Sequence, residues 1–231
     1  MGVSARVLSV HRDTEHRFSK VPCDQITVIE GLGVKGDAHS GKTVKHRSRV
    51  AVAPTQPNLR QVHLIHTELF DEMARHGFAL KPGDLGENIT TSGVDLLALG
   101  RGTKLGIGEN VVLEVTGLRN PCAQIEAFAP GLLKHVAVKT PQGIVRKSGI
   151  MTIALTGGPI RVGDVITVTP PPGPHIPLDR VKAAWLAVSC SPISPMRIIA
   201  MKTNWSAPSR SSNANRPITL AATIPTPDQI A

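Results

Sequence analysis

The 231-residue sequence contains no tyrosine, and aromatic residues make up only 3% of it. Proteins that bind single-stranded nucleic acids usually stack the bases on aromatic side chains, so this scarcity argues against a nucleic-acid partner. The formal net charge is nevertheless +9, from 26 Lys and Arg against 17 Asp and Glu. This excess favours an anionic ligand such as a phosphate, or an acidic protein partner.

Cysteine is also scarce, with Cys23, Cys122 and Cys190 widely separated and no C-x-x-C pair among them. This pattern excludes a disulfide framework and is typical of cytosolic proteins. No apolar run approaches the ~18 residues of a membrane span, and the N-terminal segment lacks the apolar core of a signal peptide. We therefore expect a cytoplasmic protein with no membrane partner.

Residues 1–170 predict one mostly β domain, a β-barrel with a few short helices. Alternation places Val111, Leu113 and Val115 on one face of a strand, and Met151, Ile153 and Leu155 on one face of another. Gly-Asp pairs and other glycine turns separate such segments at short intervals. This spacing favours a barrel over a layered sheet.

One amphipathic helix is expected near residues 67–77. Thr67 can cap it, Leu69, Met73 and His76 form its apolar stripe, and Gly77 suits its C-terminal turn. Residues 171–231 predict a Pro- and Ser-rich C-terminal extension, in which proline density disfavours long helices and sustained strands.

The segment GLGVKGDAHSGKT (31–43) satisfies two nucleotide-binding patterns, G-x-G-x-x-G and G-x-x-x-x-G-K-T. Both patterns require a helix directly after the glycines, to hold phosphates at its N-terminus. The segment 37–54 instead has no acidic residue after Asp37, no apolar stripe at helical spacing, and ends at Pro54. We interpret the segment as a glycine turn and expect neither NAD nor ATP binding.

Four motifs follow one another along the chain: GLGVKGDAHSG (31–41, followed by Arg49), PGDLGENIT (82–90), LRNPC (118–122) and GGPIRVGDVI (157–166). Together they resemble the MOSC domain, named for the C-terminal domain of molybdenum-cofactor sulfurases. The resemblance covers roughly residues 5–168 and is strongest to small stand-alone bacterial MOSC proteins related to the mitochondrial amidoxime-reducing component. It makes residues 1–170 the MOSC domain and 171–231 the extension.

The resemblance implies a barrel-like fold that holds a molybdenum–pterin cofactor, with Cys122 as metal ligand and catalytic residue. The chemistry agrees, because a thiolate is a soft ligand for a transition metal already bound by pterin sulfurs. Arg119 can favour the thiolate electrostatically, and Pro121 restricts the backbone beside it. The alternative is that Cys122 is a small buried hydrophobic residue.

The other candidate cofactor-binding residues have structural alternatives. Those for the pterin phosphate are Lys35, His39, Arg49 and Arg119. A solvated basic loop is the alternative for this group. Asp37 and Asn88 are candidates for the pterin nitrogens but also suit turns, and Glu87 can orient its loop or donate a proton. His63 and His66 would face opposite sides of a strand, so a zinc pair is not expected.

By analogy with the amidoxime-reducing relatives, we expect an oxidoreductase in which reduced molybdenum takes the hydroxyl oxygen of a small N-hydroxylated substrate. Because nucleotide motifs and a cysteine cluster are missing, the electrons must come from a separate reductase partner. The main alternative is a non-catalytic carrier of the cofactor, or of sulfur as a Cys122 persulfide. A basic nucleic-acid-binding barrel is a third option. The oligomeric state is left open, with a homodimer as one alternative.

Overall fold

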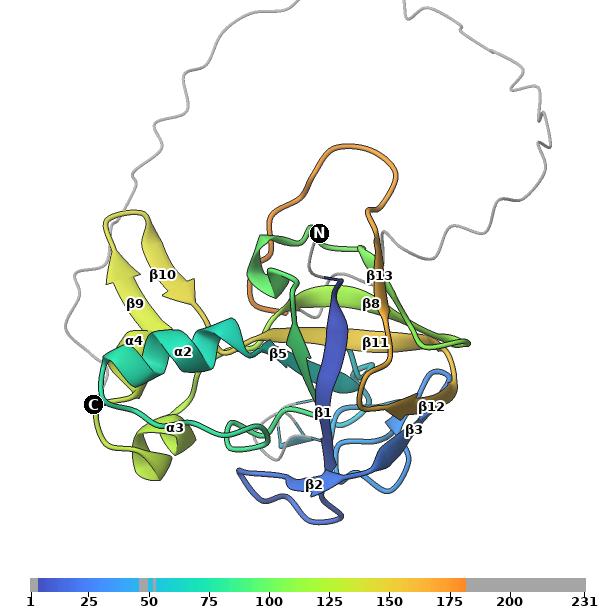
Figure 1. Ribbon diagram of the computed structural model, residues 1–231, viewed down its shortest axis with the longest axis horizontal. Helices are drawn as coiled ribbons and strands as arrows, with labels where there is room; N and C mark the ends of the chain where they lie inside the picture. The colour runs from blue at the N-terminus through green and yellow to red at the C-terminus, as the bar shows by residue number, and fades with distance from the viewer. Residues whose placement is uncertain (1–3, 46–49, 52, 182–231) are drawn as a thin grey trace, which may run out of the picture. The chain divides into compact units, whose positions relative to one another are not determined.

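The computed structural model describes residues 4–45, 50–51 and 53–181, and this part of the chain is mostly β (Figure 1). Its largest sheet has eight strands in the spatial order β13-β7-β8-β11-β5-β6-β1-β2. Their bounds are β13 Ile166–Thr169, β7 Lys104–Ile107, β8 Val111–Leu118, β11 Ile150–Thr156, β5 Val62–His66, β6 Ile89–Ser92, β1 Arg6–Arg12 and β2 Val21–Cys23. Neighbouring strands are antiparallel except β5 and β6, which are parallel.

The sheet does not close into the barrel expected from the sequence. Its edge strands are β13 and β2. Near one edge, a single isolated bridge joins Arg6 of β1 to Val165, and the Ile166 amide donates to the Ala5 carbonyl at 2.8 Å. The eight-stranded sheet is therefore open, because its two edge strands do not pair with each other. The fold also includes a three-stranded sheet of β12 (Gly158–Arg161), β3 (Gln25–Ile29) and β4 (Gly33–Val34), and a hairpin of β9 (Ala137–Thr140) and β10 (Gly143–Arg146).

The two strands expected from alternation are both present, but only one was assigned its correct buried face. In β8, Val111, Leu113 and Val115 are buried as expected. A register shift against β11 leaves Thr116 as an extra residue, and it too is buried.

In β11 the fully buried side is formed by Ile150, Thr152 and Ala154, opposite to the expectation. The expected face is half-buried, and its Met151 and Ile153 pack against a small cluster of Leu59 and Val181. Since both faces of this central strand are covered, alternation could not identify the one that packs on the main core.

The expected helix is α2 (Glu68–Arg75), and it buries Leu69, Phe70 and Met73. Phe70, not His76, completes the apolar stripe. His76 ends the helix, is exposed and stacks on His135 with ring centroids 4.2 Å apart. Two shorter helices, α3 (Ala123–Phe128) and α4 (Leu133–Val136), share an apolar cluster with α2. Thr67 occupies the N-cap position, but its side chain makes no capping hydrogen bond.

The glycine segment 31–36 consists of two turns with strand β4 between them. Gly31, Gly33 and Gly36 all have positive φ. A Cβ on Gly33 would lie 2.5 Å from the Gln61 carbonyl oxygen, so only glycine fits there. Lys42 and Thr43 lie in a bend and an isolated bridge to Pro57, without the helix start that a phosphate-binding loop needs. The described residues therefore lack the helix that both nucleotide patterns require directly after the glycines.

Residues 171–181 pack on the folded domain although the sequence assigned them to the extension. Bridges join Pro177 to Gly100 and Arg180 to Leu118, and Val181 is buried. The rest of the expected extension, with Cys190, lies outside the described residues. Among the described helices, none combines the length and apolar character needed to cross a lipid bilayer.

Candidate functional site

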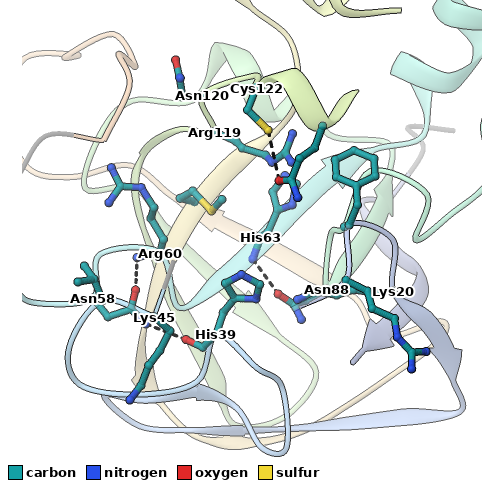
Figure 2. A pocket seen from close by; sticks show the side chains of 16 residues that line it. Lys20, His39, Lys45, Asn58, Arg60, His63, Asn88, Arg119, Asn120 and Cys122 are labelled. Atoms are coloured by element: carbon teal, nitrogen blue, oxygen red, sulfur yellow. Dashed lines mark hydrogen bonds between the residues drawn. The ribbon is translucent and has the colours of Figure 1, made fainter. Parts of the chain in front are cut away.

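A cavity of about 240 Å³ lies beside Cys122 and is drawn in Figure 2. Five of its lining residues are basic: Arg17, Lys20, Lys45, Arg60 and Arg119. No Asp or Glu is found among the described residues that line it. The lining therefore favours an anionic or neutral ligand over a cation.

The floor of the cavity is a buried hydrogen-bonded network, which we define as Lys20, Asp37, His39 and Asn88. One oxygen of Asp37, Oδ2, accepts from Lys20 Nζ at 2.6 Å and from Asn88 Nδ2 at 2.9 Å. The other, Oδ1, accepts from the His39 backbone amide at 2.9 Å. The side chains of Lys20 and Asp37 are only 4% and 2% exposed, so this ion pair is withdrawn from water.

Burial and the neighbouring groups act in opposite directions on the pKa of each member of the floor ion pair. Burial alone would raise the pKa of Asp37, but hydrogen bonds from His39 and Lys20 and the charge of Lys20 lower it well below its usual range. Burial lowers the pKa of Lys20, and Asp37 opposes that change. Removing one partner would leave the other as an unpaired buried charge.

His63 adds a neutral imidazole to the cavity wall. It lies on β5, and its amide donates to Asn88 Oδ1 at 3.2 Å. Its Nε2 donates to the Ser148 carbonyl at 2.8 Å, which assigns the proton to that nitrogen. Burial, followed by the charge of Arg119, lowers the pKa of His63 well below its usual value.

Cys122 lies at the rim of the cavity, which we define as Phe18, Arg119, Asn120, Cys122 and Gln124. Cys122 has extended backbone geometry, with φ −134° and ψ 171°, and directly precedes α3. Its thiol is half-buried and lies 3.5 Å from the Gln124 side-chain oxygen, to which it donates. Figure 2 shows the sulfur on the same side of the cavity as Arg119 and Asn120.

Arg119 has an unsatisfied donor at this rim. Its guanidinium lies 5.8 Å from the centre of the Phe18 ring. Its Nη1 is buried and has no hydrogen-bond partner among the described residues. Burial lowers the pKa of Arg119, while the charges of Cys122 and Glu87 raise it. A buried guanidinium nitrogen without a partner is suited to an incoming anionic oxygen.

Glu87 is fully buried behind the rim but does not line the cavity. Its Oε1 accepts from the Gly83 amide at 2.6 Å and from Thr90 Oγ1 at 3.0 Å. Burial raises the pKa of this carboxyl. These contacts agree with the expectation that Glu87 orients its own loop. Its Oε2 has no hydrogen-bond partner among the described residues, and the proton-donor alternative stays a prediction.

The structure brings together most of the candidates identified from the sequence. Cys122, His39, Asn88 and Arg119 line the cavity. Asp37 lies behind the lining and holds His39 and Asn88 in place. Lys35 is exposed and is not part of the lining. Arg49 lies outside the described residues.

Several lining residues were not identified from the sequence. Lys45 and Arg60 belong to the stretch 38–67, which has no Asp or Glu. This absence of acidic residues was the sequence signal that could have indicated a basic cavity wall. Arg60 donates to the Val181 carbonyl at 2.6 Å. Lys20 carried no signal because Asp37 is 17 positions away. Asn58 supports the loop by donating to the His39 carbonyl at 2.9 Å.

In the part of the chain that the structure describes, no group of three or more His, Cys, Asp or Glu side chains could hold a metal ion. His63 lines the cavity and His66 does not. Any metal at the rim would therefore meet one protein sulfur, that of Cys122, and would need the rest of its ligands from another molecule.

Comparison with known proteins agrees with this architecture. The family model described as the MOSC domain matches residues 21–167. The YuaD protein from Bacillus subtilis superposes with a TM-score of 0.61 at 24% identity, covering 72% of this chain and 96% of YuaD. YiiM from Geobacillus stearothermophilus superposes with a TM-score of 0.50 at 19% identity, covering 77% of this chain and 78% of that YiiM. YiiM from Escherichia coli superposes with a TM-score of 0.50 at 16% identity, covering 74% of this chain and 73% of that YiiM. These likenesses show a shared fold, and no curated protein matches the sequence significantly.

Proposed function

Because the chain belongs to the MOSC domain family, we propose that its cavity binds a molybdenum–pterin cofactor and that the protein reduces small N-hydroxylated compounds. Family membership indicates a function associated with the molybdenum cofactor. The observation that carries the finer proposal is that two groups lie at the same rim. One is the Cys122 thiol, and the other is the buried Nη1 of Arg119, which has no hydrogen-bond partner among the described residues.

The set of donor atoms fits a metal that arrives already chelated. Cys122 supplies one soft ligand, and the described residues contain no cluster that could complete a site without help. Cys122 would be the residue that holds a metal already chelated by pterin sulfurs. The half-buried position of Cys122 leaves its sulfur accessible from the cavity.

The charges of the cavity fit the anionic part of such a cofactor. Arg119 Nη1 offers a free donor, and Lys45 adds a cation on another part of the wall. We assign phosphate binding to Arg119, Lys45 and His39, and pterin contacts to Asn88. Asp37 acts as a positioning residue, because it fixes His39 and Asn88 without reaching the cavity. The contribution expected of Lys35 and Arg49 stays a prediction.

The reduction converts N–OH to N–H and water, and it consumes two electrons and two protons. When bound, the cofactor would supply the two-electron redox chemistry. The chain supplies binding and orientation: Asn120 and Gln124 place amide groups near Cys122 that can hydrogen bond to the substrate's N–OH group. Phe18 provides an apolar surface at the same rim.

The electrons must come from a second protein. The glycine segment lacks a nucleotide-binding helix in its described residues, and only Cys23 and Cys122 are free cysteines there. Neither a flavin or nicotinamide site of a known kind nor an iron–sulfur ligand set is therefore evident in the described chain. We propose a separate reductase as the electron donor.

The test is turnover of benzamidoxime by purified holoprotein with dithionite as chemical reductant, together with molybdenum analysis. Formation of benzamidine, and substrate-dependent change in the molybdenum electron paramagnetic resonance signal, are the expected results. Release of the cofactor to an apo-acceptor without turnover would instead establish the carrier alternative. Protein that retains no molybdenum would contradict both the reductase and the cofactor carrier, and would leave the sulfur carrier as the alternative.

A further inference from the structure

The β9–β10 hairpin leaves apolar side chains exposed. Figure 1 shows it beside α2 and α4, outside the eight-stranded sheet. Ile144 is 47% exposed and Val145 is 46% exposed, on neighbouring positions that face opposite sides of the hairpin. A two-stranded sheet is only marginally stable by itself, so exposed β-branched residues on it favour contact with another surface.

The two faces of the hairpin lead to different parts of the molecule. Register pairs Ile144 with Lys139, and alternation places Arg146 on the same face. Arg146 Nε donates to Asn120 Oδ1 at 3.1 Å, which brings this face to the cavity rim. The opposite face leads to α2, because Lys147 Nζ lies 2.6 Å from Glu72 Oε1.

The face that meets the rim is basic. It carries Lys139 and Arg146, and the sequence from residue 127 to residue 163 contains no Asp or Glu. Lys139 is exposed and forms no ion pair within the described residues. One carboxylate approaches this face, since Asp179 lies 3.9 Å from Arg146. The excess positive charge around an apolar side chain is suited to an acidic protein surface.

We propose that the face formed by Lys139, Ile144 and Arg146, the hairpin face, is the docking surface for an acidic electron-carrier protein. The need for such a carrier rests on the proposed function, and the position of the surface rests on the contact between Arg146 and Asn120. Asn120 lines the cavity and is two residues from Cys122. A carrier seated on the hairpin face is therefore held next to the rim at which electrons are needed. The positive charge attracts it and Ile144 supplies apolar contact.

The experiment uses the holoprotein and a small acidic [2Fe–2S] ferredoxin as probe. Binding is measured by calorimetry at low and high salt, and turnover of benzamidoxime is driven either by the reduced ferredoxin or by dithionite. The test variant is the double substitution Lys139→Glu/Ile144→Ser. Its matched control is Arg161→Glu/Val162→Ser, which makes the same kind of changes at exposed positions in and beside β12. Thermal melting confirms that both variants fold.

The wild type and the control should bind the ferredoxin in a salt-sensitive manner. The test variant should lose affinity by about tenfold or more, with an equal rise in the KM for ferredoxin and unchanged dithionite-driven turnover. Equal affinity in test and control variants, or no salt-sensitive binding by the wild type, overturns the docking proposal. Salt-dependent binding of a short DNA duplex that the test variant alone loses, without ferredoxin binding, would also overturn it.

Failure of the proposed function gives a different pattern. In that case dithionite drives no turnover in any variant, including the wild type. The binding comparison still decides the docking proposal, because it needs no catalysis.

Discussion

The floor and the rim of the cavity differ in how well their polar groups are satisfied. On the floor, Asp37 accepts hydrogen bonds from Lys20, His39 and Asn88, so nearly every donor has a partner inside the protein. At the rim, Arg119 Nη1 has none among the described residues, and Cys122 makes one long contact. The floor is built for rigidity, whereas the rim has bonding capacity left for a ligand.

This difference separates stability from chemistry. Changes to the Lys20–Asp37 ion pair of the floor should unfold the protein before they reveal anything about its reaction, because they leave a buried charge unpaired. Changes at the rim should impair ligand binding with little effect on folding, because the groups there already lack partners or are partly exposed. The four predictions below test this separation, in order of decreasing expected effect.

Cys122→Ser should give the largest effect and should act on chemistry alone. Replacing a soft thiolate by a hydroxyl removes the proposed metal ligand, so turnover should fall by more than about 100-fold, the upper end of what a change to a metal's outer shell costs. The free energy of unfolding should change by less than about 0.5 kcal/mol. Cys23→Ser is the matched control and should keep the wild-type turnover and the wild-type free energy of unfolding. Undiminished turnover with an unchanged molybdenum spectrum in Cys122→Ser would refute the ligand assignment.

Asp37→Ala should give the largest loss of stability. It leaves Lys20 buried and unpaired, which costs about 3–5 kcal/mol, measurable by urea unfolding. The double variant Asp37→Ala/Lys20→Met should recover much of this loss, because no buried charge remains. If the single variant were as stable as the wild type, the floor would not be the rigid part of the cavity.

Arg119→Ala should weaken cofactor retention without removing the metal ligand. Loss of a charged hydrogen-bond donor costs about 1.5–3 kcal/mol, or roughly 10- to 150-fold in affinity, measured as molybdenum retained after dialysis. Arg119→Lys should restore part of the lost affinity, since lysine keeps the positive charge but lacks the planar guanidinium group. Arg17→Ala, at an exposed side chain of the same cavity, should have little effect. Equal retention in all three would show that Arg119 does not bind the anion.

Acid should destabilise the floor through His11, which is fully buried on β1 beside Asn88. Burial, followed by the charge of Lys20, lowers the pKa of His11 from 6.5 to about 4. The unfolded chain therefore binds more protons between these values, and stability is full above pH 6.5 and falls as the pH drops toward 4. His11 alone should contribute a loss of about 2 kcal/mol between pH 7.5 and pH 5.

His11→Gln should make this part of the pH profile less steep, measured by urea unfolding at each pH, whereas the buried His63, whose pKa is also lowered, should keep part of the slope. Cys122→Ser should keep the wild-type profile, because the rim does not contribute to it. A flat profile in the wild type would contradict the assignment of a neutral buried imidazole at His11.

The sequence identified the fold class well, because strand alternation and family motifs are local signals. The face of β8 that carries Val111 and Leu113 was correct. The face of β11 was wrong, since Met151 and Ile153 pack on a second small cluster that the sequence did not reveal. Closure of the sheet was also overestimated, because edge-to-edge pairing depends on strands far apart in the chain.

The candidate site was predictable where a motif contained the residue, as for Cys122 and Arg119. Lys20 and His63 were missed because their partners lie far along the chain: Lys20 pairs with Asp37, and His63 bonds to Ser148, 85 positions away. Lys35 belongs to a motif, yet it is exposed and outside the cavity lining. Motifs therefore located Cys122 and Arg119 at the rim and Asp37, His39 and Asn88 on the floor, whereas Lys20 and His63 required the three-dimensional contacts.

The three glycines of the segment 31–36 differ in how much change they should tolerate. Gly31 has open space where a Cβ would lie, whereas at Gly33 the Gln61 carbonyl oxygen occupies it. Gln61 also donates to the Gly31 carbonyl and accepts from the Ala154 amide, so it fastens the turn to β11. Substitution tolerance along this segment should thus be uneven, with its minimum at Gly33. Gly33, which contributes to the G-x-G-x-x-G pattern, is required because its backbone lies in close contact with the backbone of Gln61.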